Sequence, residues 1–277
     1  MSHDRDRPEE HDLGLAHDLP TLLNRRRVLG LLSGAGLAAA LAACGSESSP
    51  STSGPPSGGG GSASSEQVAE GEVPEETGGP FPADGTNGVN VLTESGIVRS
   101  DIRRGFGGPS GVADGVPMTM ALTLLNMNDG DVKAYEGAAI YVWHCDAKGR
   151  YSMYDDEVGD ENYLRGVQVG DAEGKVTFQS IFPGAYAGRW PHIHFEVYPS
   201  QQAAVGASDK LRTSQIALPE KASRAAYATG SYPQSRANLA QTSLKTDNVF
   251  SDGYSLQMAK VTGSVQDGMT IALTIAV

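Results

Sequence analysis

Residues 192–198, HIHFEVY, have the pattern of a β-strand with two different faces. Side chains at positions i and i+2 of a strand point to the same side, so His192, His194 and Glu196 share one face. The residues between them are apolar and suited to a hydrophobic core. The strand therefore places two imidazoles side by side on the face opposite the core, and packing does not explain their presence there.

The rest of the C-terminal two thirds is also typical of β-structure. Residues 269–277, MTIALTIAV, alternate between two kinds of side chain, and residues 132–145 are rich in β-branched and aromatic residues. Residues 166–181 resemble two strands of a hairpin around a turn at 171–174. Only short pieces such as residues 219–228 have helical character. We expect an all-β fold, an antiparallel β-sandwich with short helical pieces in its loops.

Residues 1–43 have the pattern of an export signal. Arg25 and Arg26 precede a weakly apolar run that ends in LAAC, with Cys44 as the last residue. The run is too short for a typical membrane span and fits the core of a signal peptide. We expect a twin-arginine signal and a lipidated Cys44, which would anchor the exported protein to the outer face of the cytoplasmic membrane by its lipid alone. An ordinary secretory signal or an uncleaved membrane anchor is the alternative.

Residues 44–78 contain Cys44 and a tract rich in Gly, Ser, Pro and acidic residues. Such a tract cannot bury enough apolar surface to fold, so we expect a disordered linker. The globular domain is expected at residues 79–277, which is long enough for one core. The whole chain has 33 acidic and 21 basic residues, a net charge of −12. This balance argues against nucleic acid or an anionic membrane surface as a partner.

Histidine and cysteine are scarce in the expected domain. Three of the six histidines lie in the leader, which leaves His144 besides the pair on the strand. The single cysteine after Cys44 is Cys145, so a cysteine-rich zinc cluster is excluded. Tyrosine is an unusual further candidate. Its phenolate is a hard oxygen donor, but the free phenol loses its proton only near pH ~10, so it would need a strongly Lewis-acidic ion such as ferric iron. We expect His144 and Cys145 to be buried structural residues.

Several motifs together resemble the intradiol ring-cleavage dioxygenases, the family of protocatechuate 3,4-dioxygenase and catechol 1,2-dioxygenase. The motifs are KGRY at 148–151, YLRG at 163–166, PGAY at 183–186 and HIH at 192–194, with GPFP at 79–82 and DNVFSDG at 247–253. The HIH motif alone would be weak, because other β-proteins also place two histidines in this way. The set is specific, and the resemblance covers most of residues 79–277.

The resemblance implies a role for each matching residue. A non-haem ferric ion would be held by Tyr151, Tyr186, His192 and His194. The residues expected to act on the substrate are Arg189, Gln215 and again Tyr186. The substrate pocket would be lined by Gly79, Pro80, Phe81 and Trp190.

The implied activity is that of an oxidoreductase, the cleavage of catechol-type aromatic diols with O2 to muconate-type diacids. Its partners would be a small aromatic diol and O2, and the resemblance also allows a homo-oligomer. Tyr186 and His192 are six positions apart, closer than in intracellular members, so we expect a trimmed pocket wall. Two alternatives are an Fe(II) oxygenase with His192, His194 and Glu196 as a facial triad, and a non-catalytic binding module.

Overall fold

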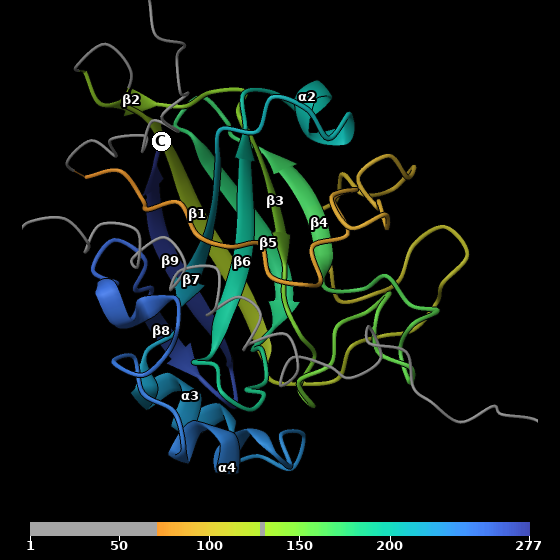
Figure 1. Ribbon diagram of the computed structural model, residues 1–277, viewed down its shortest axis with the longest axis vertical. Coiled ribbons are helices and arrows are strands. Elements are labelled where there is room, and N and C mark those ends of the chain that lie inside the picture. The colour runs from red at the N-terminus through yellow and green to blue at the C-terminus, as the bar shows by residue number, and fades with distance from the viewer. Residues whose placement is uncertain (1–70, 128–130) are drawn as a thin grey trace, which may run out of the picture. The chain divides into compact units, whose positions relative to one another are not determined.

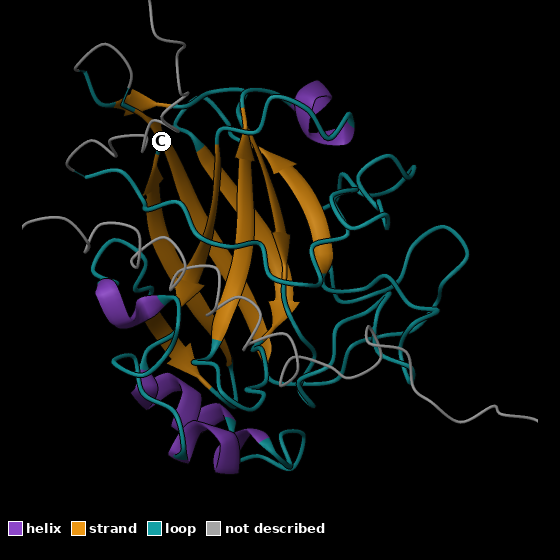
Figure 2. Ribbon diagram, in the orientation of Figure 1, coloured by secondary structure: helices purple, strands orange, loops and turns teal. Residues whose placement is uncertain are grey.

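The computed structural model describes residues 71–127 and 131–277 (Figure 1). Its strands are β1 (Pro117–Asn126), β2 (Lys133–Ala134), β3 (Ala139–Trp143), β4 (Arg165–Val169), β5 (Lys175–Ile181), β6 (His192–Tyr198), β7 (Arg212–Ala217), β8 (Lys260–Ser264) and β9 (Gly268–Ala276). Its helices are α2 (Gln201–Val205), α3 (Glu220–Ala226), α4 (Ser235–Ala240) and the 3-10 helix η3 (Phe250–Asp252). Figure 2 shows that strands dominate and that α3 and α4 lie together at one end of the sheets. The predicted all-β fold with short helical pieces is confirmed.

The strands form two sheets. One has the order β4-β3-β6-β7 and is antiparallel throughout. In the other, β1 pairs with β2 and β5 on one side and with β9 on the other, and β8 follows β9. The β1–β9 pair is parallel, so the sandwich departs here from the antiparallel arrangement that the sequence predicts. A parallel pair needs a long connection, and many residues and several other elements separate these two strands.

The core lies between the inner faces of the two sheets. β1 alternates buried and less buried residues, as a strand with one core face should. β6 differs because all seven of its residues are buried. Ile193 and Phe195 belong to the core, while His192 and His194 lie on the outer face. Loops and the chain before β1 cover that outer face, so the histidines are shielded from solvent.

The turn that joins β4 to β5 forms where the sequence predicts it. The N–H of Gly174 donates to the carbonyl of Asp171 at 2.8 Å. The flanking strands, however, do not form a hairpin, because β4 pairs with β3 while β5 pairs with β1 of the other sheet. A hairpin and a crossover between sheets can use the same turn residues, so the local pattern could not distinguish them.

Residues 71–82, here called the N-terminal strap, lie against the strands instead of forming a linker (orange in Figure 1). Val73 is 1% exposed, and its N–H donates to the carbonyl of Ala276 at 3.0 Å. The N–H of Glu76 donates to the carbonyl of Thr213 at 2.7 Å. The linker predicted up to residue 78 is therefore wrong for residues 71–78. The acidic composition of the segment predicted a linker, but one apolar residue, Val73, is buried and anchors the segment.

The expected signal peptide at 1–43, the lipidation site Cys44 and the linker up to residue 70 lie outside the described residues. Across residues 71–127 and 131–277, no helix combines the length and the apolar character that crossing a bilayer requires.

Candidate metal centre

Four side-chain donor atoms converge on the outer face of β6. Tyr186 Oη lies 3.5 Å from Tyr151 Oη and 3.1 Å from His192 Nε2. His192 Nε2 in turn lies 3.1 Å from His194 Nε2. A metal ion with bonds of about 2 Å holds neighbouring ligand atoms roughly 3 Å apart, so these distances suit one ion. The four residues proposed as ligands from the sequence are thus brought together.

The histidines are oriented and neutral. The Nδ1–H of His192 donates to the carbonyl of Trp190 at 2.5 Å, which leaves the Nε2 lone pair directed into the cluster. Burial lowers the pKa of His192 and of His194 well below the usual value of 6.5. The indole of Trp143 stacks on the His194 ring, with centroids 4.9 Å apart and planes 6° apart. Both imidazoles are therefore available to a metal at neutral pH.

Two turns packed against each other carry the tyrosines. The carbonyl of Asp146 accepts the N–H of Gly149 at 3.0 Å and the N–H of Gly184 at 3.1 Å, which joins the two turns. Gly149 has a φ of +88°, and a Cβ added there would lie 3.3 Å from the Cβ of Tyr186. The glycine therefore permits both the left-handed turn before Tyr151 and the close approach of Tyr186.

The surroundings of the two phenols favour their neutral forms unless a cation is bound. Burial raises the pKa of Tyr151 well above its usual value, and the neighbouring Tyr186 adds to the effect. Loss of hydration raises the pKa of Tyr186 to about 12. Deprotonation at neutral pH requires a strongly Lewis-acidic ion in contact with the oxygens. Two phenols and two neutral imidazoles are accordingly a donor set that fits ferric iron.

Arg189 lies beside the donor cluster, where its guanidinium has three polar neighbours. Its Nε donates to Asp247 Oδ2 at 3.0 Å, and its Nη2 donates to Gln215 Oε1 at 2.7 Å. Its Nη1 lies 3.5 Å from His192 Nε2. The arginine is therefore a fixed cation at the edge of the cluster.

Asp247 is a site residue that sequence reasoning missed. Its side chain is fully buried, and besides Arg189 its carboxylate accepts the backbone N–H groups of Trp190, Val249 and Phe250 at 2.7, 2.9 and 3.2 Å. It therefore holds the arginine and the chain that enters β6. Asp247 begins the DNVFSDG motif, and an aspartate that accepts the N–H groups two and three residues later is a known turn signal. That signal could have pointed to it.

Gln215 lies on β7, directly opposite His194 in the sheet. Both ends of its amide are in use, since Oε1 accepts from Arg189 and Nε2 donates to the carbonyl of Thr77 at 2.9 Å. The glutamine thus connects the arginine to the N-terminal strap. Both polar groups of its amide are therefore bonded within the protein, one to Arg189 and one to Thr77.

The strap closes one side of the cluster. The Phe81 ring packs on the Tyr151 ring with centroids 4.9 Å apart. A Cβ added to Gly79 would lie 3.4 Å from His194 Cε1, and Gly79 has a φ of +72°. Pro80 is exposed. Of the expected pocket residues, Gly79 and Phe81 therefore contact the donor cluster.

Trp190 is buried in the hydrophobic core. Its ring belongs to the core between the sheets, and its Nε1–H donates to the carbonyl of Leu218 at 2.8 Å. The pocket role expected for Trp190 stays a prediction. His144 and Cys145 are buried as expected, and His144 Nε2 lies 2.7 Å from Ser180 Oγ.

Glu196 does not join the histidines. Its carboxylate accepts from Tyr198 Oη and from Lys210 Nζ, each at 2.7 Å. In the part of the chain that the structure describes, no three His, Cys, Asp or Glu side chains gather as a metal-binding group. The facial-triad alternative therefore has no support, and the tyrosines are needed to complete a donor set.

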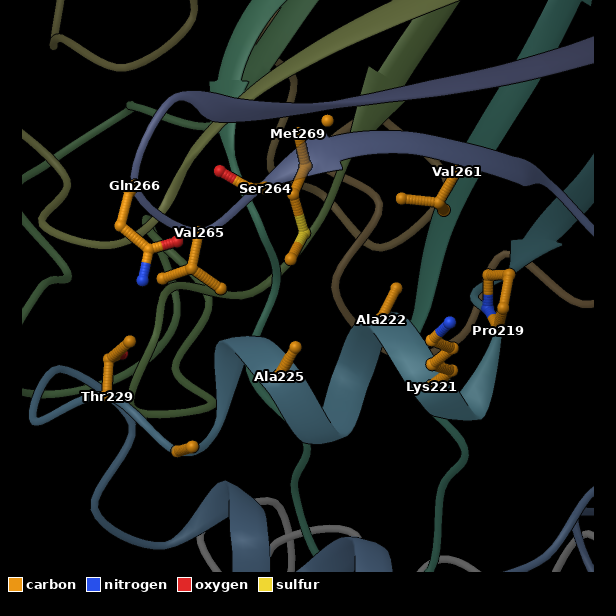
Figure 3. A pocket seen from close by; sticks show the side chains of 12 residues that line it. Pro219, Lys221, Ala222, Ala225, Thr229, Val261, Ser264, Val265, Gln266 and Met269 are labelled. Carbon is orange, nitrogen blue, oxygen red and sulfur yellow. The ribbon is translucent and has the colours of Figure 1, made fainter.

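A hollow of about 680 Å³ lies between α3 and the β8–β9 hairpin (Figure 3). Lys221 and Ala222 line it from the helix, and Val261 and Met269 line it from the strands. No residue of the donor cluster belongs to its lining. The hollow is therefore a separate feature from the candidate metal centre.

Known proteins resemble this chain in both sequence and fold. A dioxygenase family model matches residues 106–194, a range that includes both tyrosines and both histidines of the cluster. Catechol 1,2-dioxygenase from Candida albicans is 37% identical over 60 residues, which are 22% of this chain and 20% of that relative. This alignment therefore spans only a fifth of the relative's length.

Solved structures extend the likeness to most of the described fold. The intradiol ring-cleavage dioxygenase from Tetranychus urticae matches with a TM-score of 0.55 and 26% identity, over 66% of this chain and 87% of that one. Another dioxygenase crystal structure matches with a TM-score of 0.52 and 25% identity over the same shares. The sequence matches, the likeness in fold and the converging donors all indicate the intradiol ring-cleavage dioxygenase family.

Proposed function

We propose that the protein is a ferric intradiol dioxygenase that cleaves a catechol-type diol with O2 to a muconate-type diacid. The observation that carries this proposal is the convergence of two phenol oxygens and two imidazole nitrogens beside the buried Arg189. In the overall reaction the bond between the two hydroxylated ring carbons breaks. Both atoms of O2 enter the product, so no separate reductant is needed.

The residues that would hold the iron are Tyr151, Tyr186, His192 and His194. When bound there, ferric iron supplies Lewis acidity and a binding point for both oxygens of the diol. Tyr186 would bind the ion as a phenolate, and a phenolate oxygen is a proton acceptor. It can accept the proton of an incoming diol hydroxyl and leave the cluster as a neutral phenol. Tyr151 is more deeply buried, at 3% exposed, and stays packed under Phe81.

Arg189 would stabilise the negative charge that develops on the diol during cleavage. Its guanidinium is already fixed by Asp247 and Gln215, so little reorganisation is required when substrate binds. The Nη1 atom is the one that faces His192. The strap residues Gly79 and Phe81 limit the access of water on their side of the cluster.

The full-length protein loaded with ferric iron tests this proposal. Phenolate bound to ferric iron absorbs visible light, so we expect a coloured protein whose band shifts when catechol is added without O2. Tyr151→Phe and Tyr186→Phe should each shift or abolish the band. Tyr163→Phe should retain it, because the Tyr163 hydroxyl faces Asp146, 3.5 Å away. Admission of O2 should then yield the ring-cleaved diacid.

Two outcomes would contradict the proposal in different ways. A colourless protein with stoichiometric iron would remove both tyrosines as ligands. A coloured protein that binds catechol but forms no diacid in O2 would leave the ligand set intact and refute the activity.

We also propose that the protein is exported by the twin-arginine route and anchored by a lipid on Cys44. The support comes from the sequence of residues 25–44. Cys44→Ala should move the protein from the membrane fraction to the soluble exported fraction. Continued membrane association of that variant would count against a lipid anchor.

A further inference from the structure

Arg165 is a fully buried cation whose hydrogen-bond partners are all uncharged. The residue is 1% exposed. Its guanidinium donates to the carbonyls of Phe81, Pro82 and Ser152 at 3.0, 3.1 and 2.8 Å. It also donates to Ser152 Oγ and Tyr141 Oη, at 3.1 Å each. All three of its nitrogens are therefore engaged.

This environment differs from that of two other buried arginines. Arg189 pairs with Asp247, and Arg212 pairs with Glu72. Within residues 71–127 and 131–277, Arg165 has no carboxylate among its hydrogen-bond or ion-pair partners. A buried charge without a counter-charge is costly, and an apolar side chain of similar volume would avoid that cost. The position therefore uses the guanidinium for its several N–H donors.

The guanidinium joins two segments that carry parts of the metal centre. One is the N-terminal strap, reached through the carbonyls of Phe81 and Pro82. The other is the loop that carries Tyr151, reached through both oxygens of Ser152. The ring of Phe81 packs on the ring of Tyr151 where the two segments meet. Arg165 thus lies at the junction that determines this ring contact.

The register of the sheet places Arg165 in the same cross-strand row as His194. Arg165 pairs with Trp143 across β4 and β3, and Trp143 pairs with His194 across β3 and β6. The three residues therefore form one row on the outer face, with Trp143 stacked on the histidine. The row places the arginine beside the metal centre, next to the Tyr151 loop.

We propose that Arg165 is a positioning residue of the ring-cleavage site, which locks the strap to the Tyr151 loop and so sets the Phe81 ring against the Tyr151 ring. Its effect on catalysis rests on the proposed function, whereas the lock itself does not. Arginine suits this role because its planar guanidinium group can donate to several carbonyls at once. A lysine retains the charge but offers only three donors from one nitrogen.

The experiment uses Arg165→Lys, Arg165→Met and Phe81→Leu in the full-length protein, with the Arg165→Lys/Phe81→Leu double variant. Arg212→Met, alone and with Phe81→Leu, is the matched control, because Arg212 is also buried and contacts the strap, but at Glu72, away from the Phe81–Tyr151 contact. The first readout is amide hydrogen exchange of the metal-free protein at residues 79–84 and 151–155. The second is the visible band of the ferric protein, together with kcat and KM for catechol.

We expect faster exchange in both segments for Arg165→Lys and Arg165→Met, with a shifted visible band. The KM for catechol should rise about five- to tenfold, and the double variant should be no worse than the worse single variant, as expected for two residues that act as one unit. Arg212→Met should leave exchange at 151–155 and the visible band unchanged, and its effect should add to that of Phe81→Leu.

Three results would overturn the proposal. The first is unchanged exchange at 151–155 in both Arg165 variants. The second is wild-type exchange, visible band and KM in Arg165→Lys, which would show that the positive charge matters and the several donors of the guanidinium do not. The third is an additive double variant. If the wild-type protein does not cleave catechol, the proposed function fails, and the exchange measurement still decides whether Arg165 locks the two segments.

Discussion

Arg189 Nε lies 3.0 Å from Asp247 Oδ2, and the two side chains are only 7% and 0% exposed. The pair forms a neutral unit beside the donor cluster, and the carboxylate also accepts backbone N–H groups at the entrance to β6. The arginine is consequently an oriented donor, held by its ion pair with Asp247 and by Gln215.

Removal of the Asp247 carboxylate should therefore be severe. Asp247→Ala leaves a buried arginine unpaired, which typically costs about 3–5 kcal/mol of unfolding free energy. Misplacement of Arg189 should also lower kcat/KM by roughly 100-fold. Denaturant unfolding and steady-state kinetics measure the two effects. Asp101→Ala is the control, because its pair with Arg103 is about 40% exposed and such pairs contribute about 0–1 kcal/mol. Equal losses in the two variants would contradict the prediction.

Two glycines provide a matched test of how the Tyr186 turn is held. Gly149 and Gly188 have φ values of +88° and +82°, so an alanine at either position should cost about 1–2 kcal/mol in backbone strain. Only the Gly149 Cβ would meet Tyr186, at 3.3 Å, whereas nothing lies within 4 Å of a Cβ at Gly188. Gly149→Ala should therefore shift the visible band of the ferric protein and Gly188→Ala should not. Identical spectra for the two variants would show that the contact has no influence on Tyr186.

The shifted pKa of His144 should make the free energy of unfolding decrease as the pH falls. Burial lowers the pKa of His144 to about 4, against about 6.5 in an unfolded chain. Between these values the unfolded state binds the additional proton, so the free energy of unfolding decreases as the pH falls from about 6.5 to about 4. The total loss should be about 3 kcal/mol, with no further loss from this group below pH 4.

The variant His144→Gln isolates this contribution. Urea unfolding at a series of pH values should show a shallower decline for the variant than for the wild type. Parallel curves between pH 4 and 6.5 would mean that other groups cause the decline.

The strap can be tested with two valines. Val73 is 1% exposed and Val132 is 58% exposed. Val73→Ala should destabilise the protein by about 1–3 kcal/mol through lost burial. Val132→Ala should change the free energy of unfolding by no more than about 0.5 kcal/mol. A Val73→Ala variant as stable as Val132→Ala would indicate that the segment contributes nothing to the fold.

The sequence is most informative where the evidence is local. The two-residue period of β6 predicts that His192 and His194 share a face, and the buried strand has that arrangement. The turn at 171–174 is equally local and forms as predicted. Its strand partners are not local, and there the predicted hairpin fails because β5 finds its partner in β1.

In the metal centre, too, local features could be predicted from the sequence and contacts between distant segments could not. Tyr151 and Tyr186 lie on two turns that are far apart in sequence and are joined through the carbonyl of Asp146, which accepts from Gly149 and Gly184. Family motifs pointed to the tyrosines, whereas no property of either residue alone did. Arg165 serves through contacts with residues 81 and 82, more than eighty positions away, which no pattern around it could reveal.

The parallel pairing of β1 with β9 has a consequence in time. Met118 lies beside Met269 in the sheet, so β1 is synthesised about 150 residues before its partner. At roughly 5–20 residues per second, a ribosome needs about 8–30 s to cover that distance. During this interval one edge of β1 is an open template for another strand, and slow non-local pairing of this kind favours aggregation. A chain that formed β1 before β9 was synthesised would therefore expose that edge until β9 became available.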